Sequence, residues 1–298
     1  MRLLVTGSHG QVARCFLEAA PARSGITACA IGRPALDICN TPTIERAIAD
    51  IKPDVIINTA AYTAVDDAEV EPERAHALNC DGARLMSEAA NRRGVPIIQI
   101  STDYVFDGLK SSAYFESDAT APASVYGRTK LDGERAVAAA NARHIILRTA
   151  WVYSPFGKNF VKTILNNAAK GNPLRVVDDQ IGSPTYAPHL VDAILAIAEQ
   201  ITGPAAKTDV WGVYHAAGHG TASWFEVARE ILAQSKTVDG PQTALSAIGS
   251  AGYPTRAVRP KNSILNCTKM KRVFGADLPH WQTGVALCVK RLLDHPAA

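Results

Sequence analysis

Tyr126 and Lys130 are the residues of this chain whose types and spacing are best suited to chemistry. Lys130 follows Tyr126 by four positions, so on a helix the two side chains lie on one face, one turn apart. A neighbouring ammonium lowers the pKa of a phenol toward the working pH, which makes the phenol a better proton donor or acceptor. An ordinary amphipathic helix can carry the same pair, so the surrounding elements must show whether the pair is catalytic.

A glycine turn at Gly7 and Gly10 separates an apolar stretch at 2–6 from a helical stretch at 11–20. This is the context that a dinucleotide site needs. Gly7 allows the tight turn, and Gly10 lets the backbone approach a pyrophosphate that rests on the free N–H groups of the helix N-terminus. The alternative is a tight turn without a ligand. With a nicotinamide above the turn, we expect hydride transfer in which Tyr126 moves the proton.

The end of the second predicted strand bears on the choice of cofactor. An acidic residue there usually holds the adenosine ribose, but this strand ends Ile31-Gly32-Arg33. An arginine can instead pair with a 2′-phosphate, so the sequence favours NADPH, with NADH as the alternative. Arg33 is equally well interpreted as a solvated loop residue. Asp37 is the nearest acidic residue and could hydrogen-bond the adenine.

Strands and helices alternate through the first half of the chain. Apolar strands are predicted at 2–6, 26–31, 54–58, 96–101 and 144–149, with helices at 11–20, 41–51, 72–93 and 124–141. Helices are also expected near 159–170, 188–202, 222–234 and 281–294. The strands do not alternate in polarity, as expected when both faces of a sheet are buried. The predicted fold is α/β: a Rossmann-type, doubly wound parallel sheet with a smaller C-terminal substrate-binding region.

We therefore expect a dinucleotide-binding domain at residues 1–150 and a mainly substrate-binding region at 151–298, partly interleaved with the first. The composition is that of an ordinary globular protein, with 298 residues, 47% hydrophobic and 20% charged. The net charge of +3 carries no long basic cluster, so no nucleic-acid partner is expected. No apolar run approaches the length of a membrane span, and the six scattered cysteines, without zinc spacing, indicate reduced thiols in a cytoplasmic protein.

Several longer segments recur together in one known family. They are Gly7-x-x-Gly10-Gln11-Val12, Leu36-Asp37-Ile38, the stretches 58–66 and 101–108, Tyr126-Gly127-x-Thr129-Lys130, Arg148-Thr149-x-Trp151-Val152-Tyr153, Asp179-Gln180-x-Gly182-x-Pro184-Thr185 and Arg259-Pro260-x-Asn262-Ser263. On these motifs the chain resembles the dTDP-4-dehydrorhamnose reductases, which are extended short-chain dehydrogenases. The resemblance covers essentially the whole length. It implies reduction of the 4-keto group of dTDP-4-dehydrorhamnose to dTDP-L-rhamnose by NADPH or NADH, the last step of dTDP-rhamnose synthesis.

The resemblance also implies roles for individual residues. Tyr126 would protonate the oxygen at C4, while Lys130 would hold the nicotinamide ribose and lower the pKa of Tyr126. Thr102 would hydrogen-bond the substrate oxygen, and Asp103 would flank it. Gly10, Gln11 and Val12 would contact the pyrophosphate, Asp37 and Ile38 the adenosine, and Ala61, Tyr62 and Thr63 the middle of the cofactor. Trp151 would pack on the sugar, with Gln180 and Arg259 at the nucleotide end, where arginine suits a pyrophosphate. Trp151 could equally be an ordinary core residue.

One departure from the family's pattern and two rival functions bear on the prediction. Some members of the family dimerise through a cation held by glutamates, but Cys15 stands here where a carboxylate is expected, and hard cations want oxygen ligands. We therefore predict no metal, in particular no Mg²⁺, and a monomer or weak homodimer. A 4,6-dehydratase carries Asp-Glu after its catalytic threonine, whereas Thr102 is followed by Asp103-Tyr104, which favours a reductase over a dehydratase or epimerase. A non-catalytic NADP-binding regulatory subunit is the other rival.

Overall fold

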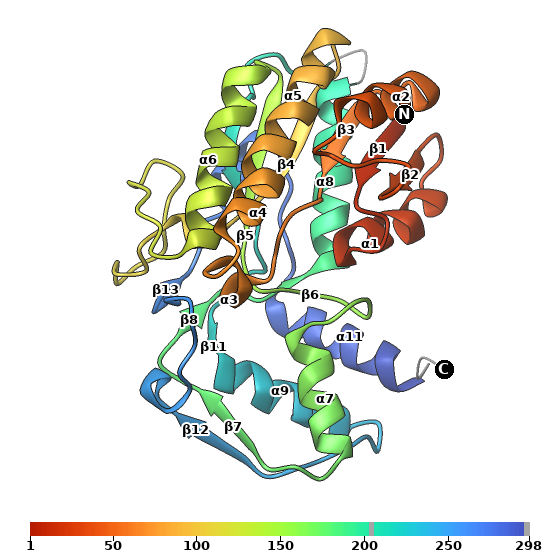
Figure 1. Cartoon of the computed structure of the whole chain (residues 1–298). Coiled ribbons are helices and arrows are strands. Elements are labelled where there is room, and N and C mark those ends of the chain that lie inside the picture. Colours follow the sequence, from red (N-terminus) through yellow and green to blue (C-terminus); the bar gives the residue numbers. More distant parts are fainter. Residues whose placement is uncertain (203–205, 295–298) are drawn as a thin grey trace.

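The protein is built around a six-stranded parallel sheet, as the computed structural model shows (Figure 1). The structure describes residues 1–202 and 206–294, so the last four residues of the predicted C-terminal region lie outside it. The strands are β1 (Arg2–Thr6), β2 (Thr27–Ile31), β3 (Val55–Asn58), β4 (Ile97–Thr102), β5 (His144–Thr149) and β10 (Gly212–His215). Their order is β10-β5-β4-β3-β1-β2, and every neighbouring pair is parallel. The predicted fold class is confirmed.

Helices cover both faces of this sheet because successive strand residues point to opposite sides. Leu3 of β1 belongs to a core shared with α1 (Gln11–Ala19), α8 (Ala187–Thr202) and α10 (Thr268–Phe274). Leu4, the next residue, belongs to a core shared with α2 (Thr41–Ile51), α5 (Ala83–Arg92) and α6 (Val125–Ala140). The unbroken apolar runs of the strands are thus explained by burial on both faces.

The helix predicted at 72–93 is not one regular helix. It consists of α4 (Pro72–His76), a π-helical segment η2 (Ala77–Gly82) and α5. α6 passes against η2 so closely that a Cβ on Gly133 would lie 2.0 Å from the carbonyl oxygen of Asn79. The apolar pattern predicted a continuous helix, because α and π turns differ by only one residue in their hydrogen-bond spacing.

Other predicted boundaries shift by a few residues. The helix expected at 222–234 is α9 (Trp224–Lys236), because Ala222 and Ser223 form the short strand β11. Ser223 then caps α9 in a capping box with Glu226. The helix expected from 124 begins one residue later, since Ser124 is the N-cap and its hydroxyl accepts a hydrogen bond from the N–H of Gly127.

The lower part of Figure 1 holds a second, smaller group of elements with its own core. These are α7 (Phe160–Ala169), β7 (Leu174–Val177), α9, β12 (Leu245–Ile248) and α11 (Trp281–Asp294), with the two-residue strands β6 (Val152–Tyr153), β8 (Ile181–Gly182), β9 (Thr185–Tyr186), β11 (Ala222–Ser223) and β13 (Asn262–Ser263). The chain passes between the two groups more than once, since α8 packs on α1 and β10 pairs with β5. Among the described residues no helix is long and apolar enough to cross a membrane.

Candidate active site

The glycine turn lies at the carboxyl edge of the sheet, directly after β1. Gly7 has a φ of +85°, a conformation that glycine adopts without strain, and its N–H donates to the carbonyl oxygen of Ile31 at 2.8 Å. Gly10 is the extended N-cap of α1, and within the described part of the chain no side chain caps that helix. The N–H groups of the first turn are therefore free to face a phosphate, so this turn fits the pyrophosphate of a dinucleotide.

Gln11 ties this turn to the C-terminal region. Its side-chain oxygen accepts hydrogen bonds from the hydroxyl of Ser154 at 2.9 Å and the amide of Asn159 at 3.0 Å. The side chain is therefore engaged within the protein, which leaves the backbone N–H of Gln11 as its group for a phosphate. Val12, the next residue, is half-buried and packs against the core under the sheet.

The three residues expected at the adenosine end differ in their environments. Arg33 is exposed and follows Gly32, whose Cα lies so close to the glycine turn that a Cβ would come within 2.9 Å of the hydroxyl of Ser8. The carboxylate of Asp37 accepts a hydrogen bond from the N–H of Cys39 at 2.9 Å. Ile38 is only 4% exposed, and its side chain packs toward Gly82, so only its backbone is placed to contact an adenosine.

The loop after β3 is held by side chains from other elements. Its start is fixed to β1, since the N–H groups of Thr59 and Ala60 donate to the hydroxyl of Thr6. Further along, the N–H of Tyr62 donates at 2.8 Å to Asn79, which also donates to the hydroxyl of Thr129 on α6. Ala61 is half-buried, Tyr62 buried and Thr63 exposed. The loop is thereby connected to the helix that carries Tyr126 and Lys130.

Thr102, Tyr126 and Lys130 come together at the carboxyl edge of β4. Thr102 is the last residue of β4, and the other two lie in the first turns of α6. Gly127 lets this helix approach, because a Cβ there would lie 2.2 Å from the carbonyl oxygen of Tyr104. All three side chains are at least nine-tenths buried. The ring of Tyr126 meets that of Tyr104 edge to face, with 5.5 Å between the ring centroids.

The electrostatics of this trio differ from the sequence-based expectation. Burial raises the pKa of Tyr126 above its usual range, the hydroxyl of Thr102 opposes the rise, and the charge of Asp103 adds to it. Burial lowers the pKa of Lys130 to about 8, and its ammonium donates to the carbonyl oxygen of Ile100 at 2.7 Å. Lys130 therefore does not bring the pKa of Tyr126 down to the working pH in this structure, because desolvation of the phenol dominates. Tyr126 stays protonated at neutral pH, which suits a proton donor.

Asp103 is buried beside Thr102, whose hydroxyl donates to one of its carboxylate oxygens at 3.0 Å. Burial raises the pKa of Asp103 to about 6, and the hydroxyls of Ser263 and Thr102 oppose that rise. The other carboxylate oxygen, Oδ2, has no hydrogen-bond partner in the described part of the chain. An unsatisfied buried acceptor next to Thr102 is a group that a ligand hydroxyl can satisfy.

Sequence reasoning missed the buried ion pair behind this trio. The guanidinium of Arg148 on β5 donates to both carboxylate oxygens of Glu134 on α6, at 2.9 and 2.7 Å, and the hydroxyl of Ser101 donates to the same carboxylate. Both charged side chains are about 5% exposed or less. The only signal was that Glu134 follows Lys130 by four residues and so shares its helix face.

The residues expected to bind substrate lie farther apart. Arg259 is close to the trio: it donates to Asp66 at 2.7 Å and to the hydroxyl of Tyr104 at 3.3 Å. Gln180 donates to the hydroxyl of Ser250 at 2.9 Å, on the C-terminal side. Trp151 directly follows the sheet with a φ of +48° and stacks on Trp224, with 3.6 Å between the ring centroids. The structure thus places Arg259 at the site and Trp151 in a contact of the C-terminal region.

A parallel doubly wound sheet with a glycine turn after its first strand and a threonine, tyrosine and lysine at its carboxyl edge is typical of an extended short-chain dehydrogenase or reductase. Comparison with known proteins identifies the family within this class. The family model described as the RmlD substrate binding domain matches residues 1–294, and the chain belongs to this family.

Relatives with known names are similar over nearly the whole chain. A protein of Sinorhizobium fredii called dTDP-4-dehydrorhamnose reductase is 46% identical over 98% of this chain and 98% of its own. A dTDP-4-dehydrorhamnose reductase structure from Clostridium acetobutylicum has a TM-score of 0.90 at 32% identity, covering 98% of this chain and all of that one. A Bacillus anthracis reductase of the same name, in complex with NADP, has a TM-score of 0.88 at 33% identity, covering 97% and 99%. The resemblance found in the sequence is confirmed.

Proposed function

We propose that this protein reduces the 4-keto group of dTDP-4-dehydrorhamnose to give dTDP-L-rhamnose, using NADPH. The family and the near-complete coverage by reductases of this name support the reaction. The observation that carries the chemistry is Tyr126, a buried phenol with a raised pKa beside the hydroxyl of Thr102. A ketone becomes an alcohol when hydride reaches carbon and a proton reaches oxygen, and Tyr126 would supply the proton.

The chain's own residues divide the work of the step. NADPH supplies the hydride when bound. Thr102 and Tyr126 hold the carbonyl oxygen at C4, and Tyr126 passes its proton to that oxygen as negative charge develops there. With a pKa of about 8, Lys130 is mostly cationic at neutral pH, so it stabilises the tyrosinate that is left and binds the nicotinamide ribose.

The cofactor would be held along the carboxyl edge of β1, β2 and β3. Gly7 and Gly10 give the pyrophosphate access to the N–H groups at Gln11 and Val12. Arg33 is exposed beside the glycine turn, where its guanidinium can pair with a 2′-phosphate, in keeping with NADPH. Asp37 and Ile38 would contact the adenosine, and the loop of Ala61, Tyr62 and Thr63 the middle of the cofactor.

The substrate would lie between the sheet edge and the C-terminal region. Asp103 offers its unsatisfied oxygen to a sugar hydroxyl. Arg259 is the candidate for the pyrophosphate of the nucleotide, for which it would exchange the carboxylate of Asp66. Gln180 and Trp151 complete the proposed set, at the nucleotide and the sugar.

Three further proposals concern organisation. Residues 1–150 would bind the cofactor and 151–298 mainly the substrate, with the first part extended by α8 and β10. We propose a monomer or weak homodimer without a bridging Mg²⁺, because Cys15 is buried and the carboxylate of Glu18 is paired with Arg291 of the same chain. A cytoplasmic location is supported by the six free cysteines, and we propose no nucleic-acid or membrane partner.

The test is an assay with purified protein, NADPH and dTDP-4-dehydrorhamnose, in which the loss of NADPH absorbance is followed and the product is identified. We expect stoichiometric NADPH oxidation and dTDP-L-rhamnose, with slower turnover on NADH. Protein that retains one tightly bound NAD and consumes no NADPH would instead be a dehydratase or epimerase. Binding of NADPH without turnover would identify a regulatory subunit.

A further inference from the structure

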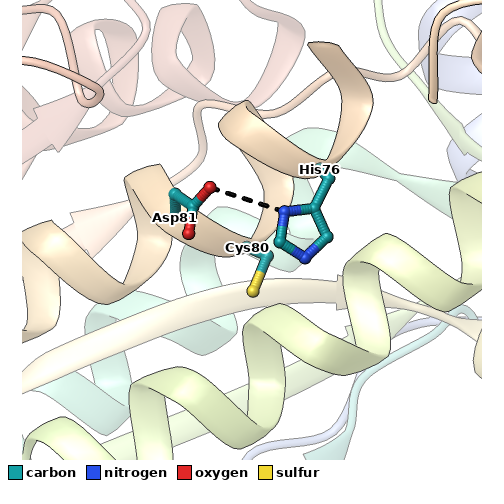
Figure 2. A group of neighbouring side chains, drawn as sticks. All are labelled: His76, Cys80 and Asp81. Carbon is teal, nitrogen blue, oxygen red and sulfur yellow. Dashed lines mark ion pairs between the residues drawn. The ribbon is translucent and has the colours of Figure 1, made fainter. Parts of the chain in front are cut away.

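A cluster of polar side chains lies on η2 and the end of α4, outside the proposed active site (Figure 2). It consists of His76, Cys80 and Asp81, and one ligand atom from each residue lies within 4.8 Å of the other two. Neither the proposed reaction nor the packing of the sheet uses these three groups together. An imidazole, a thiol and a carboxylate at this spacing are the ligand types of a zinc site.

The π turn is what brings the third residue into the cluster. On an α-helix Cys80 shares a face with His76, but residue i+5 is rotated by about 140° from residue i and points elsewhere. A π turn closes its hydrogen bonds from i to i+5 and so places Asp81 on the same face as His76, one turn further along. Zinc spacing is not recognisable in the sequence because regular α-helical geometry would separate these residues.

The distances already approach those of a metal site. The Nδ1 atom of His76 and the Oδ2 atom of Asp81 are 3.4 Å apart. Bonds of about 2.0–2.2 Å in a tetrahedron place neighbouring nitrogen and oxygen ligands roughly 3.3–3.6 Å apart. The separation of these two atoms matches one edge of such a tetrahedron, and the Sγ atom of Cys80 lies within 4.8 Å of a ligand atom of each of the two residues. Mg²⁺ and Ca²⁺ are disfavoured because two of the three ligand atoms are not oxygen.

The surroundings are negatively charged. The cluster borders an open groove of about 600 Å³ between α4, η2 and α6, which is lined by the carboxylates of Glu73, Asp81 and Asp132 against one guanidinium, that of Arg128. Asp132 is close because its neighbour Gly133 lets α6 touch the π turn: a Cβ on Gly133 would lie only 3.6 Å from the Cα of Cys80. This field attracts a cation.

We propose that His76, Cys80 and Asp81 bind one divalent cation of the zinc type, with water from the groove as the fourth ligand. Binding displaces the thiol proton of Cys80 to solvent, so the ion is held by a thiolate, an imidazole nitrogen and a carboxylate oxygen. The ion holds the π-helical segment η2 in place. Asn79 of this segment accepts a hydrogen bond from the N–H of Tyr62 and donates one to the hydroxyl of Thr129 on α6. The site therefore stabilises the contact between this segment and the helix that carries Lys130.

Cobalt is the probe that reports on the ligands, because a thiolate ligand gives Co²⁺ a charge-transfer band in the near ultraviolet and tetrahedral geometry gives it strong visible bands. We expect the full-length protein to bind one Co²⁺ with both features, and Zn²⁺ to displace it. Cys80→Ser should lose the charge-transfer band, and His76→Gln and Asp81→Asn should each weaken binding at least about tenfold.

The matched control is Cys39→Ser, which removes an exposed thiol that lies nearby, hydrogen-bonded to the carbonyl oxygen of Ala77. This variant should keep both bands. Loss of the band in Cys39→Ser, or its survival in Cys80→Ser, overturns the proposal, as does a wild-type protein that shows no thiolate band. Unchanged NADPH binding by each variant verifies that it is folded, and Zn²⁺ should raise the melting temperature of wild type but not of Cys80→Ser.

Discussion

The edge of the sheet and the C-terminal region hold their proposed site residues in different ways. At the sheet edge, Tyr126 and Lys130 are positioned by backbone that approaches within contact at Gly127 and by the buried pair of Glu134 and Arg148. In the C-terminal region, Arg259 lies on a loop and is held by the partly exposed Asp66, which itself belongs to the other side of the site.

This difference separates the groups that we propose for the chemistry from those that we propose for selecting the substrate. Close backbone contacts and a buried, bidentate ion pair give a fixed geometry for proton transfer. An ion pair with side chains 27% and 38% exposed is weak and can be exchanged for a ligand phosphate. The contact of Gln11 with Ser154 and Asn159 joins the two regions directly at the cofactor turn.

The largest expected effect is on catalysis. Tyr126→Phe removes the proton donor, so kcat should fall by about 10²–10⁴-fold while NADPH affinity stays near wild type. The matched control is Tyr104→Phe, because the ring of Tyr104 contacts that of Tyr126 while its hydroxyl accepts a hydrogen bond from Arg259. This variant should lower kcat much less. Steady-state kinetics and NADPH titration measure both. A Tyr126→Phe enzyme of near-normal kcat would remove Tyr126 from the mechanism.

Breaking the buried ion pair should damage the sheet edge itself. Glu134→Ala leaves the guanidinium of Arg148 buried without a carboxylate, which typically costs about 3–5 kcal/mol in the free energy of unfolding. Urea unfolding at pH 7 measures this loss, and Glu134→Gln, which keeps the shape, should lose less. A loss below about 1 kcal/mol for Glu134→Ala would show that this region is no more firmly held than the C-terminal one.

The buried carboxylate of Asp103 should destabilise the folded protein at neutral pH. Its pKa is raised from 3.8 to about 6 in the folded protein, so its contribution to stability is present below pH 4 and lost as pH rises through 6. Asp103→Asn should therefore stabilise the protein at pH 7.5 by up to about 3 kcal/mol and do little at pH 3.5. Urea unfolding at the two pH values tests this, and equal shifts at both would contradict it.

The charge of Lys130 should appear in the pH profile. Because its pKa is lowered to about 8, the ammonium is lost as pH rises through 8, and kcat/KM should be about tenfold lower at pH 9 than on the neutral plateau. In Lys130→Arg the charge persists, so any residual activity should not fall over this range. A wild-type profile that is flat to pH 9.5 is the result that contradicts this assignment.

The smallest effect is expected where the regions meet. Asp66→Asn removes the partner of Arg259 but should change the free energy of unfolding by no more than about 1 kcal/mol. If Arg259 binds the substrate pyrophosphate, KM for the sugar nucleotide should change more than kcat. Asp67→Asn, on the same short helix α3 (Val65–Ala68) and 3.9 Å from Arg256, is the control and should leave KM unchanged.

Local patterns explain which parts of the fold were predictable. Apolar runs and turn glycines predicted the five strands at 2–149, within one residue at either end, because these signals depend only on neighbours in the chain. The π turn at Ala77–Gly82 was not predictable from neighbours in the chain, and its contact with Gly133 of α6 involves a residue about fifty positions away. The same limit applies to Glu134, whose partner Arg148 is supplied by a different element.

The sequence by itself determined the class of fold, the family and the residue types available for chemistry, since these reside in short motifs around Gly7, Thr102 and Tyr126. Only the tertiary structure decided how those groups ionise. Burial raises the pKa values of Tyr126 and Asp103 and lowers that of Lys130, and burial depends on every element packed around them. The grouping of His76, Cys80 and Asp81 likewise required the backbone geometry, because one π turn changes which residues share a face.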